Sequence, residues 1–222
     1  MLKICPSLAS ADVTRLGDVV RELDAIPAGD PGRPDMLHLD VEDGVFVPNL
    51  TFGWKMIAGL RKLTQLPFDV HLMVSDPERY LDQFAAAGAQ VLTVHVEACP
   101  YPRRLLVGIA RRGMKPGLAL NPRTPIEVVR PYLDDITTLL LLTAEPDGAR
   151  ESMLPGAAGR VAAARRLVEN RDIDVAVDGA VDAEHLIQLY AAGATKVVAG
   201  RAVFGSSVSV RQAIANLRLL VS

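Results

Sequence analysis

The chain has 222 residues, half of them apolar, and a formal net charge of −2. This length can bury one large core, and the weak negative charge excludes a positive field that would hold a nucleic acid backbone. No apolar run reaches the ~18 residues that a membrane-spanning helix needs. The first residues turn polar at Ser7, so they lack the apolar core of a signal peptide.

Short apolar runs alternate with amphipathic stretches along the chain. The apolar runs predict strands at 3–7, 36–41, 68–73, 91–96, 116–120, 137–143, 173–178 and 196–200. The amphipathic stretches predict helices at 12–25, 54–63, 77–87, 102–112, 125–132, 157–170, 182–192 and 208–219. Asp76 before Pro77 predicts an N-cap followed by proline at the first helical position.

Strands that alternate with helices predict parallel β-α-β units. Residues 138–142 are apolar almost throughout, which is typical of a strand buried on both faces. A closed (β/α)8 barrel and an open doubly wound sheet both fit this alternation. The eight repeats within 222 residues favour the barrel. No linker divides the chain, so we predict a single TIM-barrel domain over residues 1–222.

Polar side chains gather at the ends of the predicted strands, where a barrel of this kind carries its active site. Taken singly, a strand histidine is more often a core residue, and an Asp before Gly is more often a turn residue. Their joint occurrence at one end of one barrel favours function. The residues concerned are Ser7, Ser10, His38, Asp40, His71, Met73, His95, Glu97, Asn121, Thr143, Glu145, Asp178, Gly200 and Arg201.

A candidate metal site lies among these residues. His38 and Asp40 are two positions apart, so both point to one face of a strand, and Asp69 and His71 repeat the spacing. Two imidazoles and two carboxylates, with Asp178 as the second carboxylate, can surround one divalent cation. Such ligands suit Zn, Fe, Mn or Co, and the pattern leaves the choice open.

Three further residues receive plain structural interpretations. Cys5 and Cys99 do not have a metal-type spacing. Two thiols fit a reducing cytoplasm in which both stay free, so we expect a cytoplasmic protein. Asp43 points away from the face that carries Asp40, and we interpret it as a turn residue before Gly44.

Segments spread from residue 4 to about residue 205 resemble ribulose-phosphate 3-epimerases and their allulose-6-phosphate relatives. The matching segments are 6–8, His38-Leu39-Asp40, 46–53, Asp69-Val70-His71-Leu72-Met73-Val74, 93–95, 120–122 and Val177-Asp178-Gly179. The resemblance implies a (β/α)8 barrel with one divalent metal. Its implied metal ligands are His38, Asp40, His71 and Asp178.

The same resemblance implies the reaction. Inverting a carbon beside a ketone needs a base and an acid on opposite sides of the substrate. A divalent cation would stabilise the negative charge of the enediolate and offset the desolvation of both carboxylates. We therefore expect a 3-epimerase of the ribulose 5-phosphate and xylulose 5-phosphate type, with Asp40 and Asp178 as the acid/base pair. The expected substrate-binding residues are Ser7, His71, Met73, Asn121, Gly179, Gly200, Arg201 and Arg150.

The chain departs from the family at the mouth of the metal site. A family methionine is replaced by Glu42 and another by Leu142, while Met73 is retained. Glu42 either adds a charge at the metal mouth or points outward into solvent, and the sequence leaves both interpretations open.

A second departure concerns the phosphate-binding loops. Residues 145–151 replace a glycine-rich family loop, Ala180 replaces a glycine, and Arg201 replaces a serine. Glycines let backbone N–H groups close around a phosphate, which Asp147 would repel. We expect Arg201, together with Arg150, to hold an anionic substrate end by charge-assisted bonds. The alternative for Arg150 is a solvated loop residue.

The expected partner is a small sugar phosphate, with no nucleic acid or membrane partner, and the chain is expected to form a homo-oligomer. Two other functions stay open. One is the same chemistry on a hexulose phosphate, a free ketose or a sugar acid. The other is a non-catalytic barrel that binds a sugar phosphate, and the intact set of candidate ligands argues against it.

Overall fold

The computed structural model describes residues 2–146 and 152–221. Eight parallel strands form one sheet in the order β1-β8-β7-β6-β5-β4-β3-β2. An isolated bridge between Ser7 and His38 joins the ends of β1 and β2, so the sheet is nearly closed. The strands are β1 (Lys3–Pro6), β2 (Leu37–Glu42), β3 (Phe68–Met73), β4 (Val91–His95), β5 (Lys115–Leu120), β6 (Thr138–Leu142), β7 (Asp174–Asp178) and β8 (Lys196–Ala199).

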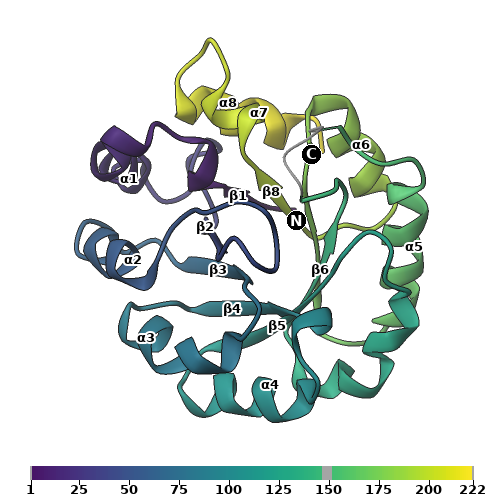
Figure 1. Ribbon diagram of the computed structural model, residues 1–222. Coiled ribbons are helices and arrows are strands. Elements are labelled where there is room, and N and C mark those ends of the chain that lie inside the picture. Colours follow the sequence, from purple (N-terminus) through teal and green to yellow (C-terminus); the bar gives the residue numbers. More distant parts are fainter. Residues whose placement is uncertain (1, 147–151, 222) are drawn as a thin grey trace.

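Helices surround the strands on the outside of the barrel (Figure 1). They are α1 (Leu16–Asp24), α2 (Trp54–Arg61), α3 (Leu81–Ala86), α4 (Pro102–Arg111), α5 (Ala157–Leu167), α6 (Ala183–Ala191), α7 (Arg201–Phe204) and α8 (Val210–Leu219). Short 3-10 helices complete the connections: η1 (Leu8–Ser10), η2 (Val13–Arg15), η3 (Pro77–Tyr80), η4 (Val96–Ala98) and η5 (Ile126–Asp135). The pairing of β1 with β8 confirms the predicted barrel and excludes the open doubly wound sheet.

Three predicted helices differ from the structure. The stretch predicted at 12–25 begins as the 3-10 helix η2 and becomes α-helical only at Leu16. The stretch predicted at 125–132 is the 3-10 helix η5, which contains Pro131, and a proline has no N–H to donate to an α-helical bond. The stretch predicted from Pro77 begins as η3 and becomes α-helical only at Leu81. Pro77 does take the first helical position, but the Asp76 side chain accepts no capping bond.

The strands alternate between two environments, as a barrel requires. On β2, Leu37, Leu39 and Val41 join the core between strands and helices, whereas His38 and Asp40 point the other way and are also buried. Inside the barrel, one apolar cluster comes from β5, β6 and β7: Ala119, Leu140, Leu142 and Ala176. The buried polar side chains of the strands come from β2, β3, β4, β6 and β8: His38, Asp40, Asp69, His71, Thr93, His95, Thr138 and Lys196.

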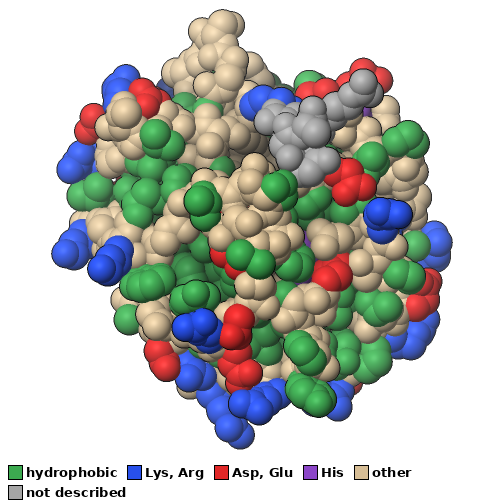
Figure 2. All heavy atoms as spheres, in the orientation of Figure 1, with side chains coloured by type: hydrophobic (Ala, Val, Ile, Leu, Met, Phe, Trp, Pro, Cys, Tyr) green, Lys and Arg blue, Asp and Glu red, His purple; other side chains and the backbone are tan. Residues whose placement is uncertain are grey.

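The outer surface carries acidic and basic side chains close together around the molecule, without a face of one sign in this view (Figure 2). Among the described residues, the helices are too short or too polar to cross a membrane.

Candidate active site

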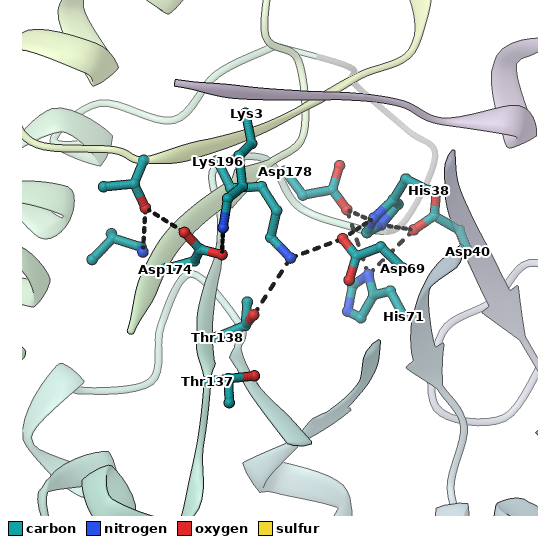
Figure 3. A network of polar contacts seen from close by, with 12 residues as sticks. Lys3, His38, Asp40, Asp69, His71, Thr137, Thr138, Asp174, Asp178 and Lys196 are labelled. Atoms are coloured by element: carbon teal, nitrogen blue, oxygen red, sulfur yellow. Dashed lines mark hydrogen bonds and ion pairs between the residues drawn. The ribbon is translucent and has the colours of Figure 1, made fainter. Parts of the chain in front are cut away.

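The four predicted metal ligands come from β2, β3 and β7 and converge in one cluster (Figure 3). One ligand atom from each of His38, Asp40, His71 and Asp178 lies within 4.8 Å of the others. Asp40 Oδ1 is 3.1 Å from His38 Nε2 and 3.2 Å from His71 Nδ1. Asp178 Oδ2 is 3.7 Å and 3.4 Å from the same two nitrogens.

These separations fit a shared cation. Two ligand atoms that each lie ~2.1 Å from a metal are about 3.0–3.4 Å apart in octahedral or tetrahedral geometry. The donor set of two imidazole nitrogens and two carboxylate oxygens suits a divalent transition metal. The residues present therefore fit the implied metal.

In this cluster, burial and the pairing of charges shift the pKa values of the ionisable side chains in opposite directions. Burial raises the pKa of Asp40, but the charge and hydrogen bonds of His38 and His71 outweigh it and lower the pKa far below the usual range. Burial lowers the pKa of His38, yet Asp40 and Asp69 raise it well above its ordinary value. Ser7 Oγ donates to Asp40 Oδ2 at 2.6 Å and so fixes that carboxylate.

A buried ion pair stands behind His38 (Figure 3). Lys196 Nζ donates to Asp69 Oδ2 at 3.1 Å, and the same oxygen lies 3.0 Å from His38 Nδ1. Both side chains of the pair are almost fully buried. Because an ionised Asp69 accepts the Nδ1 proton, Nε2 is the His38 nitrogen that would ligate a metal.

A second chain of contacts stands behind His71. His71 Nε2 is 2.8 Å from His95 Nε2, and His95 Nδ1 is 3.1 Å from Glu97 Oε2. Burial lowers the pKa of His95 to about 4, so its imidazole is neutral at physiological pH. Burial raises the pKa of Glu97, but its bonds to His95 and Thr124 and to the Asn121 amide lower it to about 2.

The remaining carboxylates at the mouth of the site separate into two kinds. Asp43 accepts from the backbone N–H of Val45 and of Phe46 and from Ser75, which agrees with its interpretation as a turn residue. Glu42 is half-buried, and burial together with Asp40 raises its pKa. Glu42 therefore lies close enough to Asp40 to act on the electrostatics of the site, and does not point fully into solvent.

An open cavity of about 450 Å³ lies over the cluster. Asp40 and Asp178 reach it from below, together with Ser7, Gly179, Gly200 and Arg201, all of which were predicted to be site residues. Residues that sequence reasoning did not select also line it, among them Asn49, Asp182 and His185. Asn49 belongs to the segment 46–53 that carries the family resemblance, so that segment could have indicated it. Asp182 and His185, at the start of α6, belong to no such segment.

The rim of this cavity departs from a glycine-lined loop. Ala180 holds a left-handed backbone conformation with φ of 54° directly after Gly179, whose φ is 106°. A side chain at Gly200 would place its Cβ 2.3 Å from Ser10 Oγ, so Ser10 would have to move to admit one. Arg201 is exposed at the first position of α7. Arg150 and Asp147 lie outside the described residues.

Three predicted substrate-binding residues do not line the main cavity. His71 lies in the ligand cluster. Met73 is buried at the end of β3. Asn121 lines a neighbouring cavity of about 360 Å³, which shares Glu145 and Pro146 with the first. The Asn121 side-chain oxygen is buried, and among the described residues it has no hydrogen-bond partner.

Comparison with known proteins gives a consistent result. The model of the ribulose-phosphate 3 epimerase family matches residues 3–204. The chain is 38% identical over 221 residues to ribulose-phosphate 3-epimerase of Bacillus subtilis, covering 98% of this chain and 99% of that protein. It is 42% identical over 209 residues to the Rhodobacter capsulatus protein of the same name, covering 94% and 89%.

Solved structures add support for the fold alone. Orotidine 5'-phosphate decarboxylase from Pyrococcus horikoshii matches with a TM-score of 0.68 at 14% identity, covering 98% of each chain. A tryptophan synthase alpha-subunit from Pyrococcus furiosus matches with a TM-score of 0.66 at 18% identity, covering 99% of this chain and 95% of that one.

Proposed function

The chain belongs to the ribulose-phosphate 3-epimerase family and is an epimerase of a pentulose phosphate, and from this premise we propose a two-carboxylate mechanism at one divalent cation. Asp40 and Asp178 form the acid/base pair, and His38, Asp40, His71 and Asp178 hold the metal. The observation that carries the proposal is the convergence of these four ligand atoms beneath an open cavity.

Each carboxylate has a defined task. One removes the proton from carbon 3 of ribulose 5-phosphate or xylulose 5-phosphate, and the other delivers a proton to the opposite face. Ser7 orients Asp40 through the bond to Oδ2. A divalent cation in this position would supply Lewis-acid stabilisation of the negative charge that develops on the substrate oxygens. Zn, Fe, Mn and Co all suit the donor set.

The anionic end of the substrate lies at the rim of the cavity in this proposal. Arg201 supplies the charge, and the backbone at Gly179 and Gly200 allows close approach. Ser7 and His71 border the reacting carbon, and Met73 and Asn121 complete the set of substrate-binding residues. Arg150 would act from outside the described residues.

We also propose that the single barrel is the whole functional domain, that it works in the cytoplasm, and that it forms a homo-oligomer. Both cysteines are buried and free, which fits a reducing compartment. Several large apolar side chains are exposed, including Tyr190 and Leu219, which is compatible with a subunit contact.

The metal ligands are tested by metal analysis of purified protein. The unsubstituted protein should hold one divalent ion per chain, and His71→Ala should lose most of it. His185→Ala is the matched control, because His185 lies at the cavity rim and outside the ligand cluster. Full occupancy in His71→Ala would overturn the ligand assignment.

The rim favours one second candidate, in which the same chemistry acts on a hexulose phosphate, a free ketose or a sugar acid. Ala180 and Arg201 replace small family residues there, and Glu145 and Asp182 line the same cavity. A screen of phosphorylated and free ketoses for exchange of the carbon-3 proton in deuterated water separates the two. The proposal requires the pentulose phosphates to exchange fastest, and a clear preference for a neutral ketose would favour the second candidate.

A further inference from the structure

We propose that Glu97 and His95 are positioning residues that set the tautomer of His71, so that its Nδ1 lone pair faces the metal position. The inference rests on the metal site proposed above. It concerns two side chains that lie behind the ligand His71 and do not belong to the ligand cluster.

The chain of contacts begins at the carboxylate of Glu97. The backbone N–H of Asn121 donates to Glu97 Oε1 at 2.8 Å, and the Thr124 hydroxyl donates to the same oxygen. Glu97 Oε2 faces His95 Nδ1 at 3.1 Å. An ionised carboxylate can only accept hydrogen bonds, so the proton between Glu97 and His95 resides on His95 Nδ1.

The contact between His95 and His71 determines in turn which nitrogen of His71 carries the proton. A neutral imidazole with a proton on Nδ1 has a lone pair on Nε2. His95 Nε2 lies 2.8 Å from His71 Nε2, so this bond needs its single proton on His71. In the metal-loaded protein, His71 then carries its proton on Nε2, and its Nδ1 is the nitrogen that would ligate the metal. That nitrogen lies 3.2 Å from Asp40 Oδ1 and 3.4 Å from Asp178 Oδ2, inside the ligand cluster.

The surroundings hold the rings in place. The Phe46 ring packs against His95 with centroids 4.8 Å apart, and the His71 and His95 centroids are 5.0 Å apart. Both imidazoles are buried, so water cannot substitute for a lost partner. Residues that orient a ligating histidine in this way typically change metal affinity 10–100-fold when they are replaced.

The Glu97→Gln substitution reverses the direction of the hydrogen bonds that run from residue 97 through His95 to His71, and it leaves the size of the side chain unchanged. The Asn121 and Thr124 donors keep the amide oxygen on their side, so the amide NH₂ faces His95 Nδ1. His95 must then carry its proton on Nε2, where it opposes the proton on His71. The proton on His71 is driven to Nδ1, the nitrogen that the metal needs.

The test measures binding of Zn²⁺ in competition with a chromophoric chelator. We expect Glu97→Gln to bind Zn²⁺ about 10–100-fold more weakly than the unsubstituted protein. Glu78→Gln, which removes an exposed carboxylate paired with Arg104, should bind as the unsubstituted protein does. Equal affinity in Glu97→Gln and Glu78→Gln would overturn the proposal.

A double-variant cycle separates the tautomer from the mere loss of a charge. In His95→Gln, the amide oxygen can accept the His71 Nε2 proton whatever residue occupies position 97. Glu97→Gln should therefore weaken Zn²⁺ binding little further in the His95→Gln background. The same fold-loss in both backgrounds would mean that Glu97 acts only through its charge, and would contradict the relay.

The unsubstituted Zn²⁺-loaded protein gives a readout that depends on no variant. Long-range ¹⁵N–¹H correlation spectra should place the His95 proton on Nδ1 and the His71 proton on Nε2. A His95 proton on Nε2 in a stoichiometrically loaded protein would overturn the relay and leave the metal site standing. Failure of the unsubstituted protein to bind Zn²⁺ at all would overturn the metal site and the relay with it.

Discussion

The floor and the rim of the cavity are built in opposite ways. The floor consists of His38, Asp40, His71 and Asp178, and the two histidines and Asp40 are buried with paired side chains. The rim consists of Glu145, Ala180, Asp182 and Arg201, which lie on loops and at the starts of helices. Ala180 is half-buried and the other three are exposed. The floor keeps the residues expected from the family, and the rim departs from them. The mechanism proposed above places the reaction on the floor and the choice of substrate at the rim.

The largest expected effect is on the floor. Asp178→Asn keeps the shape of the side chain and removes its capacity to exchange a proton, so the rate of epimerisation should fall ~10²–10⁴-fold. Steady-state assays with ribulose 5-phosphate measure it. The control is Asp134→Asn, which should retain full activity. Asp134 has an exposed side chain on η5 and does not belong to the ligand cluster. Near-normal turnover by Asp178→Asn would remove this residue from the acid/base pair.

The next largest effect is on stability, at the buried pair of Lys196 and Asp69 that contacts His38 of the floor. Lys196→Met leaves Asp69 buried without its ammonium partner, and breaking a buried pair costs about 3–5 kcal/mol. Lys3→Met breaks the partly exposed pair with Asp174 at 2.6 Å and should cost below about 1 kcal/mol. Figure 3 shows both pairs side by side. Chemical denaturation compares the free energies of unfolding, and equal losses in the two variants would contradict the contrast.

A smaller effect is expected at the rim. Arg201→Ser restores the family residue and removes the guanidinium, so KM for a phosphorylated ketose should rise about tenfold, because a charged hydrogen bond is worth roughly 1.5–3 kcal/mol. The turnover number should change little, since the floor is intact. An unchanged KM would mean that Arg201 does not hold the anionic end.

The smallest effect tests the backbone of the rim. Ala180 has a positive φ of 54°, a conformation that costs a non-glycine residue about 1 kcal/mol or more. Ala180→Gly should stabilise the protein by up to about 1 kcal/mol after the entropy cost of glycine is subtracted. Asn170→Gly, at the other non-glycine residue with positive φ among those described, should gain less, because asparagine tolerates this conformation. Destabilisation by Ala180→Gly would contradict the expectation.

The sequence predicted the barrel and the ligand cluster because both depend on local, periodic features. Apolar runs gave all eight strands, and the two-residue spacing of His38 and Asp40 placed both inside the barrel. The side-chain connections behind the ligands were not predictable in this way. Lys196 lies within an apolar strand far along the chain from Asp69, and only the closed sheet brings the two together.

The helical boundaries show a similar limit. The stretch predicted at 125–132 is a 3-10 helix that contains Pro131, because the period of apolar residues does not record the loss of an N–H donor. Residues such as Asn49 and His185 reach the cavity from loops or helix ends. Their approach is set by loop geometry, which has no repeating sequence pattern.

The most direct test of two carboxylates on opposite faces follows each pentulose phosphate epimer separately in deuterated water. In Asp40→Asn and in Asp178→Asn, the remaining carboxylate can exchange the carbon-3 proton of only one epimer. The account predicts that inversion falls ~10²–10⁴-fold in both variants, and that the residual exchange occurs in opposite epimers in the two. Near-normal inversion in either variant, or exchange of the same epimer in both, would contradict it.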